Sequence, residues 1–301
     1  MREWCEYVAV WTILKFLGIL PRPVARAVAA AMARVLLRCL PRLRRTAMTN
    51  LRLAFPDWTD EKRRETIRAM TRSLGWMAAE FAHFPELTRE NIEKLVALDG
   101  FENFDAARRR GKGVIFLTGH MSAWELAPFA QALYGYPLSF LARAIDNERV
   151  DRLIDSYRCR SGNRPIEKNN AARTMLRVLR EGGTVGVLAD QNTSVEEGVF
   201  VNFFGIPAAT TTGLVRMARH TGAAVVPGFL SWDKGEGKYR LRFERAVEMR
   251  STEDEAGDIQ ENAARCSQVT EDYVRTHPDQ WLWIHMRWKN RPAGEPPFYD
   301  E

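Results

Sequence analysis

The sequence lacks the cysteine and histidine spacings that hold disulfides or metals. Its four cysteines, Cys5, Cys39, Cys159 and Cys266, stand far apart in a chain of 301 residues, and none belongs to a C-x-x-C pair. This scatter argues against a disulfide framework or a cysteine zinc site and is typical of a reducing compartment. No histidine pair has the H-E-x-x-H spacing, so we expect neither a metal nor another bound cofactor.

Signatures of the common hydrolases, nucleotide-binding proteins and nucleic-acid-binding proteins are missing as well. The chain has no G-x-S-x-G elbow, no P-loop and no dinucleotide-binding glycine pattern. Zinc-finger, RNP and homeodomain patterns are also absent, so nucleic acid is not an expected partner. The 46% hydrophobic and 27% charged residues are ordinary for a folded protein with enough chain for a sizeable core.

A long uninterrupted apolar run is missing too. The longest candidate, residues 7–20, is interrupted by Lys15, whereas a membrane-spanning helix needs roughly 20 predominantly apolar residues. No small-residue cleavage site follows it, which argues against a signal peptide. Whether this segment spans a membrane or lies in its surface is left open by the sequence.

Acidic residues are scarce at the start of the chain. Residues 1–55 contain ten Lys or Arg and only two Glu, so their net charge is +8 and the remaining residues carry −2 of the total +6. Within residues 24–40, apolar side chains recur at helical spacing and the arginines fall mostly on another face. Such a helix lies in the head-group layer of an anionic membrane or packs as an ordinary surface helix. We expect residues 1–95 to form a basic helical membrane-associating region, in which residues 1–55 contact the membrane and another helix covers 60–84.

From residue 96 onward the pattern alternates between strands and helices. Short apolar, β-branched runs occupy residues 113–118, 138–142, 184–189, 223–230 and 239–247, and helical patterns occupy 122–133, 147–161, 171–181, 211–221 and 259–276. This alternation predicts an α/β domain over residues 96–301, with a mostly parallel sheet flanked by helices. Ligands of such sheets gather at the carboxyl ends of the strands.

His120 and Glu125 follow the first of these strands in the order H-x4-E. With His120 in the loop and Glu125 in the first helical turn, the carboxylate can hold one imidazole nitrogen and leave the other free as a base. Ser122 and Glu125 also fit a capping box, in which Glu125 only caps its own helix and His120 is a loop histidine. Both interpretations stay open at this point.

Further polar groups follow other strands. Arg143 comes after the second strand and is a candidate to bind an oxyanion or phosphate, or to form a structural ion pair. Asp190 and Gln191 follow the third strand. The apolar loop 199–204 is expected to line a ligand channel, to abut a membrane or to pack in the core.

These segments, in this order, resemble the lysophospholipid acyltransferase superfamily, and specifically its bacterial lipid A late (lauroyl or myristoyl) acyltransferase branch. The resemblance covers about residues 40–290 and rests on several motifs in fixed order. They are RTAMTNLRLAFP at 45–56, LTGH-x4-E at 117–125, R-x3-N-x3-DR at 143–152, LADQ at 188–191, GVFVNFFG at 198–205 and the Trp-rich segment 273–288.

The resemblance implies a glycerolphosphate-acyltransferase-like fold at the cytoplasmic face of the bacterial inner membrane. It also implies transfer of a fatty acyl chain from acyl carrier protein or CoA to a hydroxyl of a lipid A precursor or related glycolipid. His120 is then the general base with Glu125 as its partner, and Arg143 binds an oxyanion or phosphate. The supporting site residues are Asn147, Asp190, Gln191, Gly205 and Thr210. The alternatives are a lysophospholipid, phosphatidylinositol mannoside or other lipid acceptor, and a catalytically inactive lipid-binding membrane protein.

Overall fold

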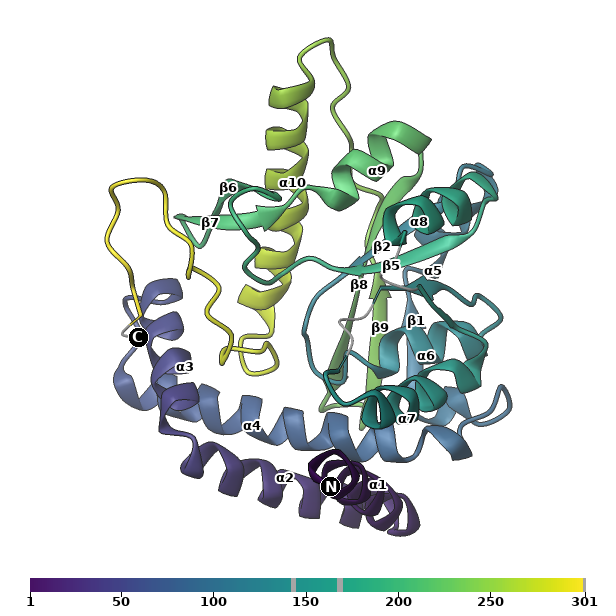
Figure 1. Cartoon of the computed structure of the whole chain (residues 1–301), viewed down its shortest axis with the longest axis vertical. Helices are drawn as coiled ribbons and strands as arrows, with labels where there is room; N and C mark the ends of the chain where they lie inside the picture. The colour runs from purple at the N-terminus through teal and green to yellow at the C-terminus, as the bar shows by residue number, and fades with distance from the viewer. Residues whose placement is uncertain (142–144, 167–169, 300–301) are drawn as a thin grey trace.

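The structure is a computed structural model that describes residues 1–141, 145–166 and 170–299. A layer of N-terminal helices lies across one end of an α/β body, as Figure 1 shows. The helices are α1 (Arg2–Ile19), α2 (Arg22–Cys39), α3 (Pro41–Ala54), α4 (Asp60–Ala82), α5 (Phe101–Arg109), α6 (Leu126–Leu133), α7 (Glu148–Arg158), α8 (Ala171–Arg180), α9 (Gly213–Thr221) and α10 (Glu255–Thr276). The strands are β1 (Val96–Asp99), β2 (Val114–Thr118), β3 (Ser139–Phe140), β4 (Arg164–Pro165), β5 (Thr184–Leu188), β6 (Gly198–Phe203), β7 (Ile206–Thr211), β8 (Ala224–Asp233) and β9 (Lys238–Phe243).

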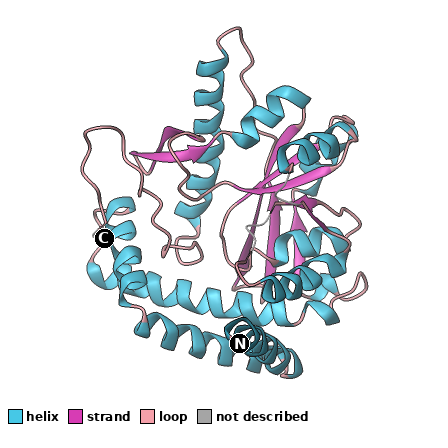
Figure 2. Cartoon of the chain, in the orientation of Figure 1, coloured by secondary structure: helices cyan, strands magenta, loops and turns pink. Residues whose placement is uncertain are grey.

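The main sheet is mostly parallel and is flanked by helices (Figure 2), which confirms the predicted fold class. Its order is β1-β9-β8-β2-β5-β3-β4, and β2 pairs in parallel with both β5 and β8. Within the described sheet, the antiparallel pair is β8 with β9. All five residues of β2 are buried, which explains why this strand reads as a continuous apolar run.

Several elements differ from the sequence prediction. Segment 198–211 forms the antiparallel hairpin β6–β7 instead of an apolar loop, and its turn residues Phe204 and Gly205 both have positive φ, 55° and 75°. Positive φ at both turn positions matches the twist of a two-residue hairpin, but Phe-Gly lacks the Asn-Gly signal that marks such turns in a sequence. Helix α3, strands β1 and β4 and helix α5 were not expected. Helix α6 begins at Leu126, four residues later than predicted.

The hairpin packs in the core. Phe203 and Phe204 are buried in a cluster with Trp281, Trp283 and Trp288. Of the three interpretations of loop 199–204, core packing is therefore the one that the structure supports for these aromatic side chains.

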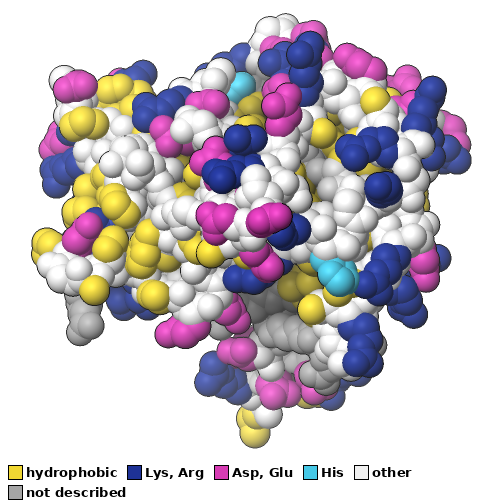
Figure 3. Space-filling view, turned by 90° about the horizontal axis from the view of Figure 1, so that it is seen from above, with side chains coloured by type: hydrophobic (Ala, Val, Ile, Leu, Met, Phe, Trp, Pro, Cys, Tyr) yellow, Lys and Arg dark blue, Asp and Glu magenta, His cyan; other side chains and the backbone are white. Residues whose placement is uncertain are grey.

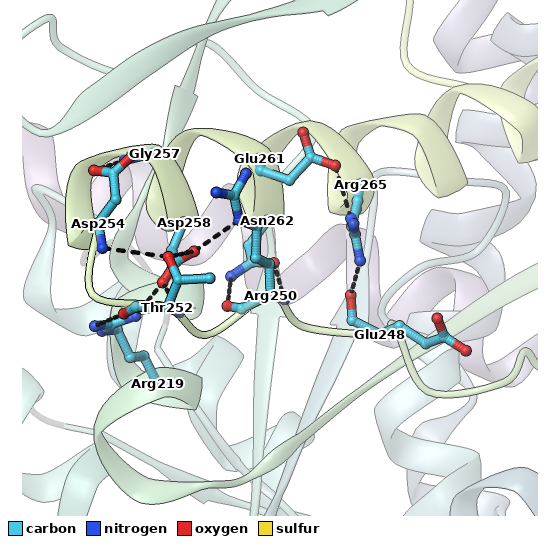
Figure 4. A network of polar contacts seen from close by, with 10 residues as sticks. All are labelled: Arg219, Glu248, Arg250, Thr252, Asp254, Gly257, Asp258, Glu261, Asn262 and Arg265. Carbon is cyan, nitrogen blue, oxygen red and sulfur yellow. Dashed lines mark hydrogen bonds and ion pairs between the residues drawn. The ribbon is translucent and has the colours of Figure 1, made fainter.

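A polar network fastens the start of α10 to α9 (Figure 4). The carboxylate of Asp258, which is fully buried, accepts hydrogen bonds from the guanidinium of Arg219 (2.6 Å) and the amide of Thr252 (2.5 Å). The side chain of Asn262 bonds both the amide and the carbonyl of Arg250, at 2.7 and 2.8 Å. These contacts fix the direction of α10, which runs beside the hairpin.

Helix α2 packs along α4 at very close range. A Cβ atom on Gly75 of α4 would lie 2.4 Å from the Cα of Ala30 on α2, so glycine is required at this contact. The buried carboxylate of Glu80 on α4 accepts a hydrogen bond from Arg26 on α2 (2.5 Å). The guanidinium of Arg26 also lies 4.5 Å from the ring centre of Trp232, near the end of β8. The helical layer is thus anchored at the carboxyl end of this strand.

Exposed apolar side chains are concentrated on the first two helices. Twelve of the sixteen large hydrophobic side chains that are exposed in the described residues lie in residues 1–40, on α1, α2 and their flanking residues. They are Met1, Trp4, Val8, Trp11, Ile13, Phe16, Ile19, Val24, Met32, Val35, Leu36 and Leu40. On the side away from α2, charged side chains of both signs are interspersed (Figure 3). Among the described helices, none is long and apolar enough to span a bilayer.

Candidate active site

The loop that follows β2 carries His120 and is held by a distant part of the chain. The carbonyl of His120 accepts a hydrogen bond from the amide of Leu282 (3.1 Å), and the amide of Ser122 donates to the carbonyl of Gln280 (2.7 Å). Ser122 has a φ of 51°, an uncommon value for a residue with a side chain. The C-terminal segment therefore holds the loop in a conformation that it would rarely adopt alone.

Asp190, which follows the neighbouring strand β5, holds the imidazole of His120. Nδ1–H of His120 donates to Oδ1 of Asp190 (2.8 Å), and the backbone amide of His120 donates to Oδ2 (2.7 Å). The indole N–H of Trp281 donates to the same Oδ2 atom, also at 2.7 Å. A Cβ on Gly119 would approach this carboxylate to 3.0 Å, so a glycine before His120 makes the close contact possible.

The two groups shift each other's pKa in opposite directions. Burial alone raises the pKa of Asp190, but the charge of His120 and the hydrogen bonds from His120 and Trp281 lower it to about 2. Burial likewise opposes protonation of His120, but the charge of Asp190 and the hydrogen bond to it raise the imidazole pKa above 6.5. Asp190 is therefore ionised at neutral pH, and its bond to Nδ1–H leaves the lone pair of neutral His120 on Nε2.

Glu125 has a different partner from the one expected. Both of its oxygens accept hydrogen bonds from the guanidinium of Arg158 on α7, at 2.6 and 2.8 Å. Asp190 therefore occupies the position at the imidazole that the sequence assigned to Glu125. The capping-box interpretation does not describe the structure either, because the N-cap residue of α6 is Glu125 instead of Ser122 and its side chain makes no capping hydrogen bond.

His120 lies at the edge of a cavity of about 380 Å³. Its apolar wall includes Trp124, Phe140 and Leu188, and its polar groups include Arg158 and the side chain of Gln191. The amide nitrogen of Gln191 lies 3.2 Å from Nε2 of His120. The cavity thus combines a histidine base, a cation and an apolar surface, which is the chemistry that proton transfer at an apolar substrate needs.

The other predicted site residues lie elsewhere. Asn147 caps α7 through the amides of residues 149 and 150, and its side-chain amide donates to Glu3 and Glu6 at the start of α1. Gly205 lies in the turn of the β6–β7 hairpin. Thr210 accepts a hydrogen bond from Arg287 (2.6 Å). These three residues are absent from the described lining of the His120 cavity. Arg143 lies outside the described residues.

Sequence reasoning did not identify Arg287 as a functional candidate. Its guanidinium is fully buried and donates to the carbonyl of Ala209 (2.6 Å) and, at 3.5 Å, to that of Gln191. Burial lowers the pKa of Arg287 to about 10. The side chain ties strand β7 to the segment that carries Asp190. The sequence signal near Arg287 was the Trp-rich segment 273–288. Local periodicity does not show that this segment packs against the strand ends that carry His120 and Asp190.

Metal ligands do not gather anywhere in the described part of the chain. Within residues 1–141, 145–166 and 170–299, no three His, Cys, Asp or Glu side chains are placed to hold a metal ion. The geometry on which a function can be built is therefore that of His120, Asp190 and the cavity.

The chain is similar to several known proteins. A family model described as bacterial lipid A biosynthesis acyltransferase matches residues 1–290. The chain is 27% identical to a lipid A biosynthesis acyltransferase of Haemophilus influenzae, over 84% of this chain and 77% of that protein. It is 27% identical to the lipid A biosynthesis lauroyltransferase of Escherichia coli, over 99% of this chain and 95% of that protein. Among solved structures, the 1-acyl-sn-glycerophosphate acyltransferase PlsC of Thermotoga maritima is similar with a TM-score of 0.40 and 16% identity, over 87% of this chain and 99% of that one.

Proposed function

Because this chain belongs to the bacterial lipid A biosynthesis acyltransferase family, we propose that it transfers a fatty acyl chain from an acyl thioester to a hydroxyl of a lipid A precursor or related glycolipid. It is an acyltransferase, and such an enzyme uses an acyl donor and a lipid acceptor. The observation that carries the proposal is the Asp190–His120 pair, which directs a basic nitrogen to the edge of a cavity with an apolar wall.

The proposed reaction needs one base and no covalent intermediate. Nε2 of His120 takes the proton of the acceptor hydroxyl while the oxygen attacks the thioester carbonyl. The C–S bond then breaks, and the leaving sulfur takes the proton from the imidazolium. Asp190 keeps the proton on Nδ1 and stabilises the imidazolium that forms, since its carboxylate is ionised and hydrogen-bonded to the ring.

The negative charge that develops on the carbonyl oxygen requires hydrogen-bond donors. Arg158 lines the cavity, and its two bonds to Glu125 and one to Asp155 use three of the five guanidinium N–H groups. We assign to Glu125 the role of holding this guanidinium at the cavity wall. Arg158 is thus one candidate for the oxyanion or for a substrate phosphate, and Arg143 remains the candidate that the sequence proposes.

The donor is either acyl carrier protein or CoA carrying the acyl chain. Both present the same thioester carbonyl and both belong to the cytoplasm, so the proposed location is the cytoplasmic face of the bacterial inner membrane. The exposed apolar side chains of α1 and α2, together with the basic residues of segment 1–55, support peripheral attachment to an anionic membrane.

The route from this surface to the base is short. Asn147, at the start of α7, bonds Glu3 and Glu6 of α1, and Arg158, at the end of α7, lines the His120 cavity. A helix of 11 residues is roughly 16 Å long. A lipid whose acyl chains stay in the membrane can therefore present its head group near His120.

The first test measures acyl transfer and thiol release together. Purified protein in detergent is given dodecanoyl thioesters of acyl carrier protein and of CoA, with an under-acylated lipid A precursor as acceptor. We expect ester formation that is lost by about 10²–10⁴-fold in His120→Ala, because this variant lacks the base. Lysophospholipid and phosphatidylinositol mannoside acceptors run in parallel would identify the alternative substrates. Equal transfer by His120→Ala would refute the mechanism, and lipid binding without any transfer would favour an inactive lipid-binding protein.

A further inference from the structure

The nitrogen of His120 that the proposed reaction uses already has a hydrogen-bond partner. Because Nδ1–H donates to Asp190, the lone pair of the neutral ring is on Nε2. The side-chain amide of Gln191 lies 3.2 Å from Nε2 and donates to it. A substrate hydroxyl has to replace this amide before its proton can pass to the imidazole.

The backbone around Gln191 is held on several sides. Asp190, before it, is bonded by His120 and Trp281. The amide of Asn192, after it, donates to Nε2 of His285 (3.0 Å). Since this backbone is fixed, the amide group leaves His120 by rotation of the Gln191 side chain, which borders the cavity.

We infer that Gln191 prevents water from using His120 as its base, and thereby directs the acyl group to the lipid hydroxyl instead of to hydrolysis. The inference rests on the proposed function and concerns how the same site selects its acceptor. In the hydrolysis that Gln191 suppresses, a water proton goes to Nε2 and the water oxygen bonds to the thioester carbonyl carbon. The C–S bond breaks and the sulfur takes the proton, so a fatty acid and a thiol are formed.

Water and a lipid acceptor differ in the binding contacts that can compensate for displacing the Gln191 amide. Displacing Gln191 breaks one hydrogen bond to the base. A lipid acceptor makes contacts far from the reacting hydroxyl that offset this loss, whereas a water molecule makes none. The loss of the amide therefore accelerates hydrolysis more than it affects transfer at saturating acceptor, because a bound acceptor has already displaced the side chain.

The test replaces Gln191 by Met, which has a similar length but donates no hydrogen bond. With the dodecanoyl thioester that the wild type uses and no lipid acceptor, we expect thiol release to rise by about three- to tenfold, the value of one ordinary hydrogen bond. The ratio of thiol release without acceptor to transfer at saturating lipid A precursor is expected to rise by a similar factor, and the acceptor KM to fall. General damage to the site would lower both rates instead.

Two further variants make the outcome specific. Gln191→Asn keeps the amide on a shorter side chain that does not reach Nε2, and it is expected to release thiol as Gln191→Met does. Gln268→Met makes the same chemical change on the exposed surface of α10, where Gln268 bonds Asp272, and is expected to behave as the wild type.

Two different failures can be told apart. If the wild type forms ester but neither Gln191 variant raises thiol release, the inference about water is refuted and the acyltransferase function stands. If the wild type forms no ester with either donor and any of the acceptors, the proposed function is refuted and this inference with it.

Discussion

At the scale of single residues, Asp190 sets both the tautomer and the charge of His120. Its carboxylate accepts from Nδ1–H and raises the imidazole pKa above 6.5, against the opposing effect of burial. Below the raised pKa the imidazole is protonated and accepts no proton. The rate of transfer is therefore expected to increase with pH through a pKa that is higher than 6.5.

Replacing Asp190 by Asn changes this pH dependence in a defined direction. Without the negative charge, the imidazolium is less stable, so the acid limb of kcat/KM is expected to move to lower pH. The plateau is expected to fall by about 10²–10⁴-fold, because Asn does not hold the required tautomer. A pH profile of kcat/KM for the wild type and this variant measures both effects.

The matched control is Asp105→Asn on α5, where the carboxylate pairs with Arg108 and Arg109. It should leave the profile unchanged. An acid limb of Asp190→Asn that stays in place or moves to higher pH would mean that Asp190 does not set the charge of His120.

The sequence predicts which residues belong to this site better than it predicts which of them contact each other. His120, Asp190 and Gln191 are recognisable because each follows an apolar strand. That Asp190 contacts His120 depends on the pairing of β2 with β5, a register between segments about seventy residues apart, which no local pattern contains. Between His120 and Glu125, Ser122 has an unusual φ of 51°, and a sequence motif does not encode that angle.

At the scale of elements, the contact between α2 and α4 determines whether the N-terminal helices stay attached to the body. A Cβ on Gly75 would lie 2.4 Å from the Cα of Ala30, so even Gly75→Ala forces the two helices apart. We expect this change to lower the free energy of unfolding by about 1–3 kcal/mol, the usual cost of overpacking. Urea unfolding followed by circular dichroism measures the difference.

Gly213→Ala at the start of α9 is the matched control, since a Cβ there would lie 3.6 Å from Oγ1 of Thr211, an ordinary contact. In a helix, alanine is favoured over glycine by about 1 kcal/mol. This control is therefore expected to be as stable as the wild type or slightly more stable. If Gly75→Ala is equally stable, the helices do not depend on the close approach.

Elements with strong periodicity were predictable, and those with unusual local signals were not. The fully buried strand β2 and the capped helix α4 lie close to their expected positions. The hairpin β6–β7 was missed because its turn is Phe-Gly. Helix α3 was missed although Pro41 in its first turn and its arginines both favour a helix. In both cases tertiary contacts stabilise the element: the hairpin packs on α10, and α3 packs on α4.

At the scale of the whole molecule, the distribution of apolar surface makes a prediction about membrane binding. Val35 and Leu36 on α2 are 57% and 60% exposed, and the exposed Arg34 and Arg38 lie beside them in the same helix. Replacing both by Glu removes apolar area and opposes the positive charge, while the core is untouched. Burial of each such side chain in a membrane contributes about 1.5–3 kcal/mol, so we expect the affinity for anionic vesicles to fall by at least about tenfold. Sedimentation with vesicles containing anionic phospholipid measures the bound fraction.

Val195→Glu supplies the control, because Val195 is 53% exposed but lies outside α1 and α2. A general effect of an added carboxylate would weaken vesicle binding in both proteins, whereas attachment through α2 weakens it in the Val35 and Leu36 variant alone. The double variant of Val35 and Leu36 should still release thiol from a soluble acyl thioester at the rate of the wild type, since the His120 cavity is unchanged. Transfer to a vesicle-embedded acceptor should fall with the bound fraction. Undiminished binding of the double variant would show that the exposed face of α2 does not contact the membrane.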